Sequence, residues 1–317
     1  MKILVTGAAG MIGRKLVQRL EGELTLHDVA EFRAGARTVV SDLAVPGVAE
    51  ALIAERPALI FHLAAVVSGE AEADFDKGYR VNLDGTRRLF EAIRQAGGGY
   101  RPRLVFASSI AVFGAPFPEA IGDDFLSAPL TSYGTQKAIG ELLLADYSRR
   151  GFFDGIGIRL PTICVRPGRP NQAASGFFSG IIREPLNGEE AVLPVPETVR
   201  HWFASPRAAV GFLLHAAALP EERLGARRSL NMPGVCASVG EQIAALRKIA
   251  GEHTAALIRR EPDATITRIV AGWPQNFDAR RALSLGFRAD ASFEDIIRIH
   301  IEEEKAQKSP PPRPARA

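Results

Sequence analysis

A glycine-rich segment at residues 6–13 is the feature that most constrains what this chain can fold into. The segment directly follows a short apolar run, residues 2–6, which is typical of a buried strand. It then opens a pattern typical of a helix over residues 11–20, in which apolar side chains recur on one face. A strand, a glycine-rich turn and a helix in this order predict the first unit of a dinucleotide-binding fold.

Each glycine of this segment has a separate physical task. Gly7 permits the sharp turn, Gly10 lets a pyrophosphate approach the backbone, and Gly13 permits close packing of the helix on the strand. The amides at the start of the helix, at Met11 and Ile12, supply free N–H groups and the positive end of the helix dipole. We therefore expect these five residues to hold the phosphates of a dinucleotide cofactor.

An acidic residue stands where the second strand should end. Asp28 lies 21 residues after Gly7 and can accept hydrogen bonds from the ribose hydroxyls of the adenosine. A carboxylate at this position repels a 2′-phosphate, so the sequence predicts NAD rather than NADP as the cofactor. Arg33 and Arg37 are close in sequence and could soften this preference, but we interpret them as surface residues.

Apolar runs alternate with helical patterns throughout the first half of the chain. Strands are expected at residues 2–6, 24–27, 58–63, 104–107 and 156–160, and helices at residues 11–20, 81–95, 133–147, 208–218, 239–250 and 293–305. This alternation predicts the α/β class, as a Rossmann-type doubly wound parallel sheet with a smaller C-terminal substrate-binding part.

Prolines divide the chain beyond residue 160 into short pieces. We expect residues 1–160 to form the NAD-binding Rossmann domain. Residues 161–308 are expected to form mainly the substrate-binding region, partly interwoven with the Rossmann sheet. Residues 309–317 are rich in proline and arginine, which predicts a disordered tail.

Composition and patterning disfavour several classes of function. Basic residues outside the tail are interspersed with acidic ones, and the net charge of +3 forms no stripe typical of nucleic-acid binding. The chain shows no apolar run long enough for a membrane span and no signal-peptide pattern. Its two cysteines, Cys164 and Cys236, form no disulfide framework and lack metal-binding spacing. We therefore expect a cytoplasmic protein with a small-molecule substrate and no nucleic-acid, membrane or metal partner.

Tyr133 and Lys137 are spaced to share one face of a helix. A phenol has a pKa of about 10 and is a poor base at neutral pH, but a neighbouring ammonium and a positively charged nicotinamide both favour the phenolate. Ser109, at the end of an apolar strand, offers a hydroxyl that can bond a substrate oxygen as its charge changes. These three residues are the predicted catalytic group, with Ser108 as the alternative for the serine role.

Three motifs together resemble the extended short-chain dehydrogenase/reductase family, also described as the NAD-dependent epimerase/dehydratase family. Residues 133–137 match its Y-x-x-x-K, and residues 7–13 match its glycine spacing. Residues 108–114 match its S-S-x-x-V-Y-G, with Phe113 in place of the common tyrosine. The resemblance implies an NAD-dependent enzyme acting on a CH–OH group, often as a homodimer. It also gives Lys137 a second task, which is to hold the nicotinamide ribose.

The same resemblance assigns further residues to the cofactor site, where Tyr133 also lies. Asp42 and Leu43 match an acid–apolar pair that meets the adenine, and Pro161 follows the strand at which the family contacts the nicotinamide. The other matches are Leu63, Ala64, Ala65 and Asn82. For Asn82 the sequence leaves direct cofactor contact and helix bracing open, and the neighbouring His62 is interpreted as structural.

Two motifs that the chain lacks limit the possible reactions and substrates. Dehydratases of the family carry an Asp–Glu pair where this chain has Ile110 and Ala111, so water elimination is excluded. Nucleotide-sugar epimerases carry an R-Y-F-N-x-x-G pattern that residues 159–168 lack. A sugar or nucleotide-sugar epimerase with bound NAD remains the alternative. A non-catalytic NAD(P)-sensing regulator is a distant one, because regulators typically lose the tyrosine and lysine that this chain keeps.

Three stretches resemble instead the family's dehydrogenases of small sugar acids, namely residues 62–72, 166–171 and 173–179. This implies oxidation of the C2 hydroxyl of a four-carbon, erythronate-like acid to a 2-oxo acid. The substrate's carboxylate then needs an arginine or a set of polar donors, because an arginine can grip it with two charge-assisted hydrogen bonds.

Arg200 is the first candidate for that arginine, because it occupies the family's R-D-F position. His201 and Trp202 replace the acid and the phenylalanine there, so the contact differs from that of the relatives. Arg166 and Ser68 are the other candidates for binding the acid. Ser109 and Tyr133 are expected to meet its reacting hydroxyl.

Overall fold

The computed structural model of the chain describes residues 1–168 and 175–308. In these residues the predicted parallel sheet has seven strands, which are β1 (Lys2–Thr6), β2 (Glu23–Asp28), β3 (Arg37–Val40), β4 (Leu59–His62), β5 (Arg103–Ser109), β6 (Asp154–Leu160) and β10 (Ser229–Asn231). The helices that cover it are α1 (Met11–Val17), α2 (Val48–Ile53), α5 (Gly85–Gln95), α6 (Ser132–Arg149) and α8 (Pro206–Ala218). Shorter pieces at its edge are α3 (Ser68–Ala73), α4 (Phe75–Gly78), a π-helical turn η1 (Tyr79–Asp84) and a 3-10 turn η2 (Ile110–Val112).

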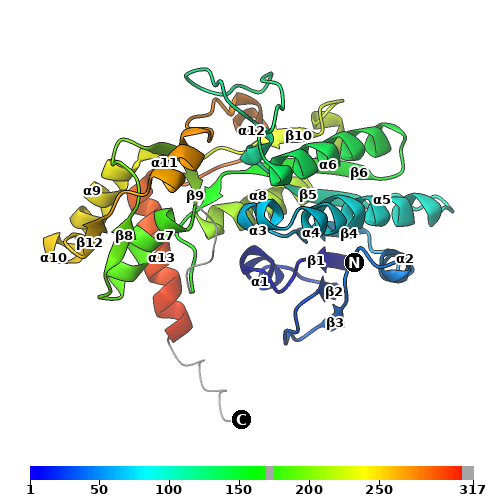
Figure 1. Cartoon of the computed structure of the whole chain (residues 1–317). Coiled ribbons are helices and arrows are strands. Elements are labelled where there is room, and N and C mark those ends of the chain that lie inside the picture. Colours follow the sequence, from blue (N-terminus) through cyan, green and yellow to red (C-terminus); the bar gives the residue numbers. More distant parts are fainter. Residues whose placement is uncertain (169–174, 309–317) are drawn as a thin grey trace, which may run out of the picture.

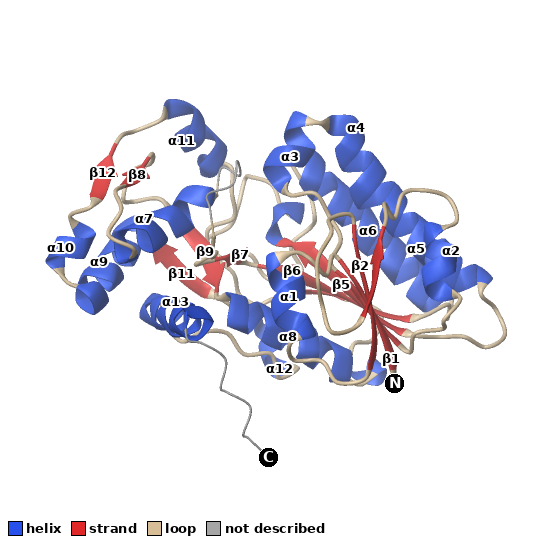
Figure 2. Ribbon diagram, turned by 90° about the horizontal axis from the view of Figure 1, so that it is seen from below, coloured by secondary structure: helices blue, strands red, loops and turns tan. Residues whose placement is uncertain are grey.

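The strands lie in the order β3-β2-β1-β4-β5-β6-β10, and every neighbouring pair is parallel. The chain winds outward from β1 to β3 and then returns to β4 on the other side of β1. Figure 2 shows the sheet with α2, α5 and α6 on one side and α1 and α8 on the other. The predicted doubly wound fold is therefore confirmed. Because the winding reverses at β1, the carboxyl ends of β1 and β4 flank a crevice of the kind in which such sheets bind ligands.

Side chains alternate along the strands and so build two cores. Leu4 and Ile60 pack with α2, α5 and α6 around Phe90, whereas Ile3 and Phe61 pack with α1 and α8. All five side chains are at most 2% exposed. A strand that is buried on both faces reads as a continuous apolar run, which is why the sequence predicts these strands.

The structure differs from the sequence-based expectation in several elements of the first half. It adds β3 and α2. β3 is a four-residue edge strand whose residues are mostly exposed, so it lacks the longer apolar run of a buried strand. The helix expected at 81–95 starts as the π-helical turn η1 and becomes α-helical at Gly85. The helix expected at 11–20 ends early, because the amides of Arg19 and Leu20 bond to carbonyls three residues back instead of four.

The second half of the chain contributes both to this sheet and to a separate layer. β10 extends the sheet beside β6, and α8 covers one of its faces. The remaining elements are β7 (Thr162–Ile163), α7 (Gly176–Leu186), β8 (Ala191–Leu193), β9 (Arg200–Ala204), η3 (Glu221–Arg223), β11 (Val235–Ser238), α9 (Val239–Ala250), α10 (Glu252–Ala255), β12 (Ile258–Arg260), α11 (Ala264–Ala271), α12 (Arg280–Ser284) and α13 (Phe293–Lys308). β7, β9 and β11 form a second sheet, and α7, α9 and α13 enclose a further core around Phe178 and Phe203. Figure 1 shows much of this layer on the side of the main sheet away from the N-terminus.

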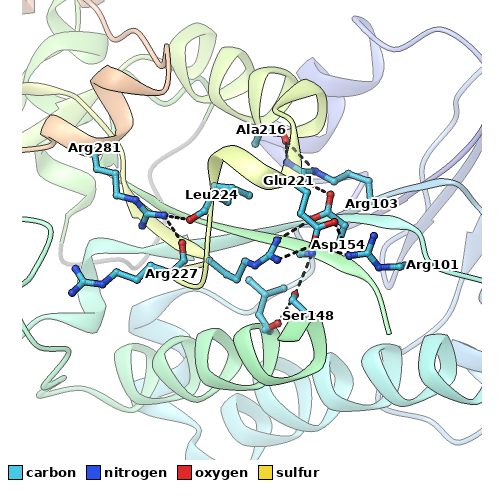
Figure 3. A network of polar contacts seen from close by, with 12 residues as sticks. Arg101, Arg103, Ser148, Asp154, Ala216, Glu221, Leu224, Arg227 and Arg281 are labelled. Atoms are coloured by element: carbon cyan, nitrogen blue, oxygen red, sulfur yellow. Dashed lines mark hydrogen bonds and ion pairs between the residues drawn. The ribbon is translucent and has the colours of Figure 1, made fainter. Parts of the chain in front are cut away.

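Ion pairs tie together the amino ends of β5 and β6. Arg103 and Asp154 are register partners at the start of these strands, and their side chains form an ion pair. Asp154 also binds Arg228, just before β10, at 3.0 Å. Arg103 donates to the carbonyl of Ala216 in α8, and Glu221 joins the cluster through Arg228 at 2.8 Å (Figure 3). This cluster links the sheet to the elements from the second half of the chain.

Two sequence-based expectations fall on residues that the structure does not describe. These are the proline- and arginine-rich tail at 309–317 and residues 169–174, which carry parts of two stretches that resemble sugar-acid dehydrogenases. None of the helices in the described ranges combines the length and the apolar composition that crossing a membrane requires.

Phe90 provides a test of the core between the sheet and α5. Its side chain is fully buried, with ring contacts to Phe106 and Phe153 at centroid distances of 6.4 and 5.0 Å. Phe90→Ala removes these contacts and leaves a cavity, so it should lower the free energy of unfolding by about 3–5 kcal/mol in a denaturant titration. Leu126→Ala is the control, because Leu126 is 80% exposed. A similar loss in both variants would contradict this account of the core.

Candidate active site

The glycine turn after β1 has the shape that a dinucleotide needs. Gly7 has a φ of +75°, and a Cβ there would lie 2.6 Å from the amide nitrogen of Ala64 after β4. A Cβ on Gly13 would lie 2.8 Å from the Cα of Ala8, so α1 can pack onto β1 only with glycine at this position. Side chains at either position would fill the space, so the two glycines keep the turn tight and the crevice open.

The start of α1 leaves backbone donors for a phosphate. Gly10 precedes the helix with an extended backbone and offers no side chain to cap it. The first amides of a helix have no carbonyl partner within the helix, and these belong to Met11, Ile12 and Gly13. The predicted phosphate-binding residues therefore lie together at one end of α1, and they fit a dinucleotide.

Asp28 stands beside this turn at the end of β2. Its carboxylate accepts hydrogen bonds from the amides of Ala9 at 2.9 Å and Ala30 at 3.0 Å, which fixes it next to the glycine segment. Arg33 is exposed, and Arg37 forms a surface ion pair with Glu55 at 3.2 Å. The carboxylate is thus the charged group held against the turn, as the sequence predicts for a ribose-binding acid.

The acid–apolar pair predicted for the adenine lies just beyond β3. The Asp42 carboxylate accepts from the amide of Ala44 at 2.9 Å and forms an ion pair with Arg80 from η1. Leu43 is buried at 4% exposure and packs into the core between the sheet and α5. The structure therefore shows protein partners for both residues, and their contact with adenine stays a prediction.

The segments that follow β4 and β6 line the same edge of the sheet. Leu63, Ala64 and Ala65 are half-buried and continue the chain from β4 past the glycine turn. The amide of Leu63 bonds to the carbonyl of Thr6, and this places the run directly beside the end of β1. Pro161 is buried between β6 and β7.

Asn82 stabilises the segment that follows β4. Its side chain accepts from the amide of Val66 at 2.9 Å and donates to the carbonyl of Val66 at 3.2 Å. It also donates to the side chain of Gln136 in α6 at 2.7 Å. Of the two roles that the sequence leaves open, the geometry supports bracing, because the amide group already binds the backbone after β4 and a neighbouring helix.

His62 is structural, in agreement with its sequence-based interpretation. Its ring nitrogens bond to the hydroxyls of Thr6 at 2.7 Å and Thr86 at 2.9 Å. Complete burial lowers the pKa of His62 to about 3, and the charge of Lys137 acts in the same direction. A neutral imidazole between two threonines connects β1, β4 and α5 beneath the cofactor crevice.

The predicted tyrosine and lysine lie on the first turns of α6. Thr131 caps the helix by accepting from the amide of Gly134 at 3.0 Å. Lys137 is 3% exposed, and its ammonium donates to the carbonyl of Ala107 in β5 at 2.9 Å. The ammonium is 5.7 Å from the centre of the Tyr133 ring. Burial lowers the pKa of Lys137 to about 8, although the charge of Glu141 acts against this.

Two groups act on the half-buried phenol of Tyr133. Burial raises the pKa of Tyr133, while a hydrogen bond with Ser109 and the charge of Arg166 both lower it. The structure therefore brings Tyr133, Lys137 and Ser109 together from α6 and β5, and it adds Arg166 to the group. This arrangement can remove a proton from an alcohol while hydrogen bonds and positive charge stabilise the anionic oxygen.

Adjacent side chains of a strand point to opposite faces, and this separates the two serines at the end of β5. Ser108 is 3% exposed and donates to the carboxylate of Glu141. Ser109 lies near enough to Tyr133 to lower the pKa of its phenol by hydrogen bonding, and it accepts from the amide of Ala111 at 3.1 Å. The geometry therefore supports Ser109 over Ser108 in the catalytic role.

The candidate substrate residues are not all in one place. Arg166 is close enough to Tyr133 for its charge to lower the phenol's pKa. Arg200 is 41% exposed, forms an ion pair with Glu241 at 3.1 Å and lines a cavity of about 620 Å³. Ser68 begins α3, which the structure docks against α6.

Two features of the site have no clear signal in the sequence. Glu72 of α3 accepts from the amide of Ser132 at 2.9 Å and so holds α3 against the start of α6. The cavity beside Arg200 is also lined by Phe117, Cys236 and Gln275, which come from three distant segments. Only the tertiary fold brings these residues together, so no spacing pattern reveals them.

Comparison with known proteins places this geometry in context. A family model described as "NAD dependent epimerase/dehydratase family" matches residues 3–220. The chain is 49% identical to D-erythronate dehydrogenase of Cupriavidus necator, over 96% of this chain and 98% of that protein. It is 42% identical to D-erythronate dehydrogenase of Haemophilus influenzae, over 95% of this chain and 99% of that protein.

Solved structures give the same fold. The chain superimposes with a TM-score of 0.93 and 63% identity on a structure described as a nucleoside-diphosphate-sugar epimerase from Agrobacterium tumefaciens, over 96% of this chain and 95% of that one. MoeE5 in complex with UDP-glucuronic acid and NAD gives a TM-score of 0.79 at 27% identity, over 97% of this chain and 100% of that one. The two sets of relatives thus carry both dehydrogenase and epimerase names.

Asp28 should decide the choice between the two nicotinamide cofactors. The unmodified protein should favour NAD over NADP by at least about tenfold in kcat/KM, because the carboxylate repels a 2′-phosphate. Asp28→Asn keeps an acceptor for the turn but removes the charge, so it should narrow that ratio. Glu31→Ala, at an exposed acid nearby, should leave the ratio unchanged. Equal use of both cofactors by the unmodified protein would assign the dominant charge to Arg33 or Arg37 instead.

Proposed function

We propose that this chain, which belongs to the NAD dependent epimerase/dehydratase family, oxidises the C2 hydroxyl of D-erythronate or a similar small sugar acid to the 2-oxo acid. Two nearly full-length relatives with that name support the substrate class. The catalytic residues proposed for this reaction are Ser109, Tyr133 and Lys137. We also propose that the enzyme acts in the cytoplasm, as a homodimer and without nucleic acid. The free thiols of Cys164 and Cys236 are consistent with a reducing compartment.

The observation that carries the proposal is the charge of Arg166 beside the phenol of Tyr133. In a 2-hydroxy acid the carboxylate is attached to the carbon that reacts, so it must lie next to the base. Arg166 is half-buried, and this burial lowers the pKa of its guanidinium. A buried cation is costly unless an anion pairs with it, and the substrate's carboxylate can supply that anion.

The chain's own residues divide the work of the reaction. The glycine turn and the first amides of α1 would hold NAD, which would supply the hydride acceptor for C2. Tyr133 takes the proton of the C2 hydroxyl, and Ser109 donates a hydrogen bond to the oxygen that becomes the carbonyl. The ammonium of Lys137 favours the phenolate form of Tyr133. Arg166 holds the carboxylate so that the hydroxyl faces Tyr133 and not the solvent.

An epimerase with bound NAD would use the same tyrosine, so the tyrosine alone does not separate the two activities. What favours the dehydrogenase is the half-buried cation near the base. Within residues 1–168 and 175–308 Arg166 forms no ion pair, and a neutral sugar ring would supply no anion for it. The two activities also differ in their products. A dehydrogenase accumulates NADH in proportion to the acid consumed, whereas an epimerase returns its cofactor to the oxidised state.

Tyr133→Phe tests the base in this reaction. The variant keeps the ring but loses the proton acceptor, so kcat for NADH formation from D-erythronate should fall by about two to four orders of magnitude. NAD affinity, measured by titration calorimetry, should stay close to that of the unmodified protein. Near-normal turnover in the variant would remove Tyr133 from the mechanism. If the unmodified protein converts nucleotide sugars without accumulating NADH and does not oxidise D-erythronate, the protein is an epimerase and the proposal is rejected.

Arg166→Lys tests the carboxylate contact, with Arg200→Lys as its matched partner. Lysine keeps the charge but loses the planar pair of donors, so Arg166→Lys should raise the KM for the acid by about tenfold or more. The KM for NAD should change little. Arg200→Lys should leave both constants nearly unchanged, because Arg200 is already paired with Glu241. The reverse pattern would move the carboxylate to the cavity that Arg200 lines.

A further inference from the structure

Glu141 is a buried acid next to the catalytic group, and the mechanism above does not use it. It follows Lys137 by one turn on α6 and is 6% exposed. Ser108 of β5 donates to its carboxylate, and the guanidinium of Arg159 in β6 binds both of its oxygens, with the closest approach at 2.7 Å. In the described residues, the hydrogen bonds of this carboxylate therefore come from side chains of two strands.

The partners of Glu141 adjoin residues proposed to act in the reaction. Ser108 immediately precedes Ser109 in the chain, and Arg159 is two residues before Pro161. Ser108 and Arg159 are also register partners across β5 and β6. One carboxylate on α6 thus contacts the carboxyl ends of both β5 and β6 at the level of the site.

Arg159 is itself held firmly. It donates to the side chain of Asn231 in β10 at 3.1 Å, and its guanidinium is 4.8 Å from the centre of the Phe113 ring. Asn231 in turn donates to the carbonyl of Gly122 at 3.2 Å. The guanidinium of Arg159 therefore has a fixed orientation. Because it binds the Glu141 carboxylate, it fixes the position of that carboxylate relative to the sheet.

We propose that Glu141 is a positioning residue for the reaction, which fastens Ser108 and Arg159 to α6 and thereby sets the distance between Ser109 on β5 and the Tyr133–Lys137 pair on α6. This inference rests on the proposed function, because it assumes that those three residues carry the chemistry. Small errors in the placement of reacting groups cost large factors in rate, so a group that fixes two elements at the site affects kcat directly.

The charge of Glu141 has a second consequence for Lys137. The groups around that ammonium are Glu141 and Tyr133 on its own helix, the neutral His62 on β4, and the Ala107 carbonyl on β5. Of these, Glu141 is the negative charge, and it raises the pKa of Lys137 against the effect of burial. Removing the charge should therefore let Lys137 lose its proton at a lower pH.

Asp154, at the amino ends of β5 and β6, provides a matched control for Glu141. Asp154 in β6 pairs with Arg103 in β5, and these residues are also register partners. The Asp154 side chain is 16% exposed and binds a second arginine, Arg228, at 3.0 Å. Both acids therefore pair with an arginine of these two strands, but Asp154 lies at the amino ends of the strands, away from the site.

The test compares Glu141→Gln with Asp154→Asn at a temperature where both proteins are folded. Each change removes one carboxylate charge that pairs with an arginine, at nearly constant shape, so both should lower the unfolding temperature. Only Glu141→Gln should lower kcat for the acid, by about tenfold to a hundredfold. Only Glu141→Gln should move the alkaline limb of the kcat profile to lower pH. The affinity for NAD, measured by titration calorimetry, should be unchanged in both.

The proposal is overturned if Glu141→Gln matches Asp154→Asn in kcat and in pH profile. If Glu141→Gln does not fold, Ser108→Ala decides, because it deletes one donor to the carboxylate. A normal kcat in Ser108→Ala then overturns the proposal, and a reduced kcat with normal NAD affinity supports it. Tyr133→Phe, assayed alongside, separates the two claims. Turnover retained there rejects the proposed function, whereas an inactive Tyr133→Phe beside a normal Glu141→Gln rejects only the positioning role.

Discussion

The close approach of α6 to β5 is the constraint on which the rest of the site depends. Two glycines in α6 make it possible, because a Cβ on Gly134 would overlap the backbone carbonyl of Ala111 in η2, directly after β5, and one on Gly140 would lie 2.8 Å from the ring of Phe106 in β5. With the helix this close, the Lys137 ammonium reaches the carbonyl of Ala107. A thicker helix face would separate the base from the strand that carries its serine.

The sequence predicts those functional groups that are formed by residues close together in the chain. The glycine turn, Asp28 at a strand end, and the Tyr133–Lys137 pair are each defined by a few neighbouring residues, and the structure places them along one edge of the sheet. The apolar strands are equally visible, because burial on both faces leaves no polar alternation. Edge strand β3 is missed for the opposite reason, since its residues are mostly exposed.

What the sequence cannot predict are contacts between distant segments. Arg200 attracts attention through its motif position, yet the structure pairs it with Glu241, while Arg166 acts on Tyr133 from the loop after β7. The choice between Ser108 and Ser109 likewise depends on which face of β5 each occupies, and adjacent positions in a motif do not reveal that. Buried charges such as Glu141 look like ordinary helix-surface acids until the opposing strand is known.

The participation of β10 in the main sheet has a consequence for how this protein can be divided and recombined. β10 comes from a late part of the chain, yet it supplies the neighbour of β6, and the Arg228 that precedes it binds Asp154 at the start of β6. A fragment that stops at residue 160 would leave β6 as an open edge and Asp154 without one of its two cations. The first 160 residues are therefore not a detachable module. Recombination between relatives has to exchange β10 together with the strands β1 to β6 whose sheet it completes.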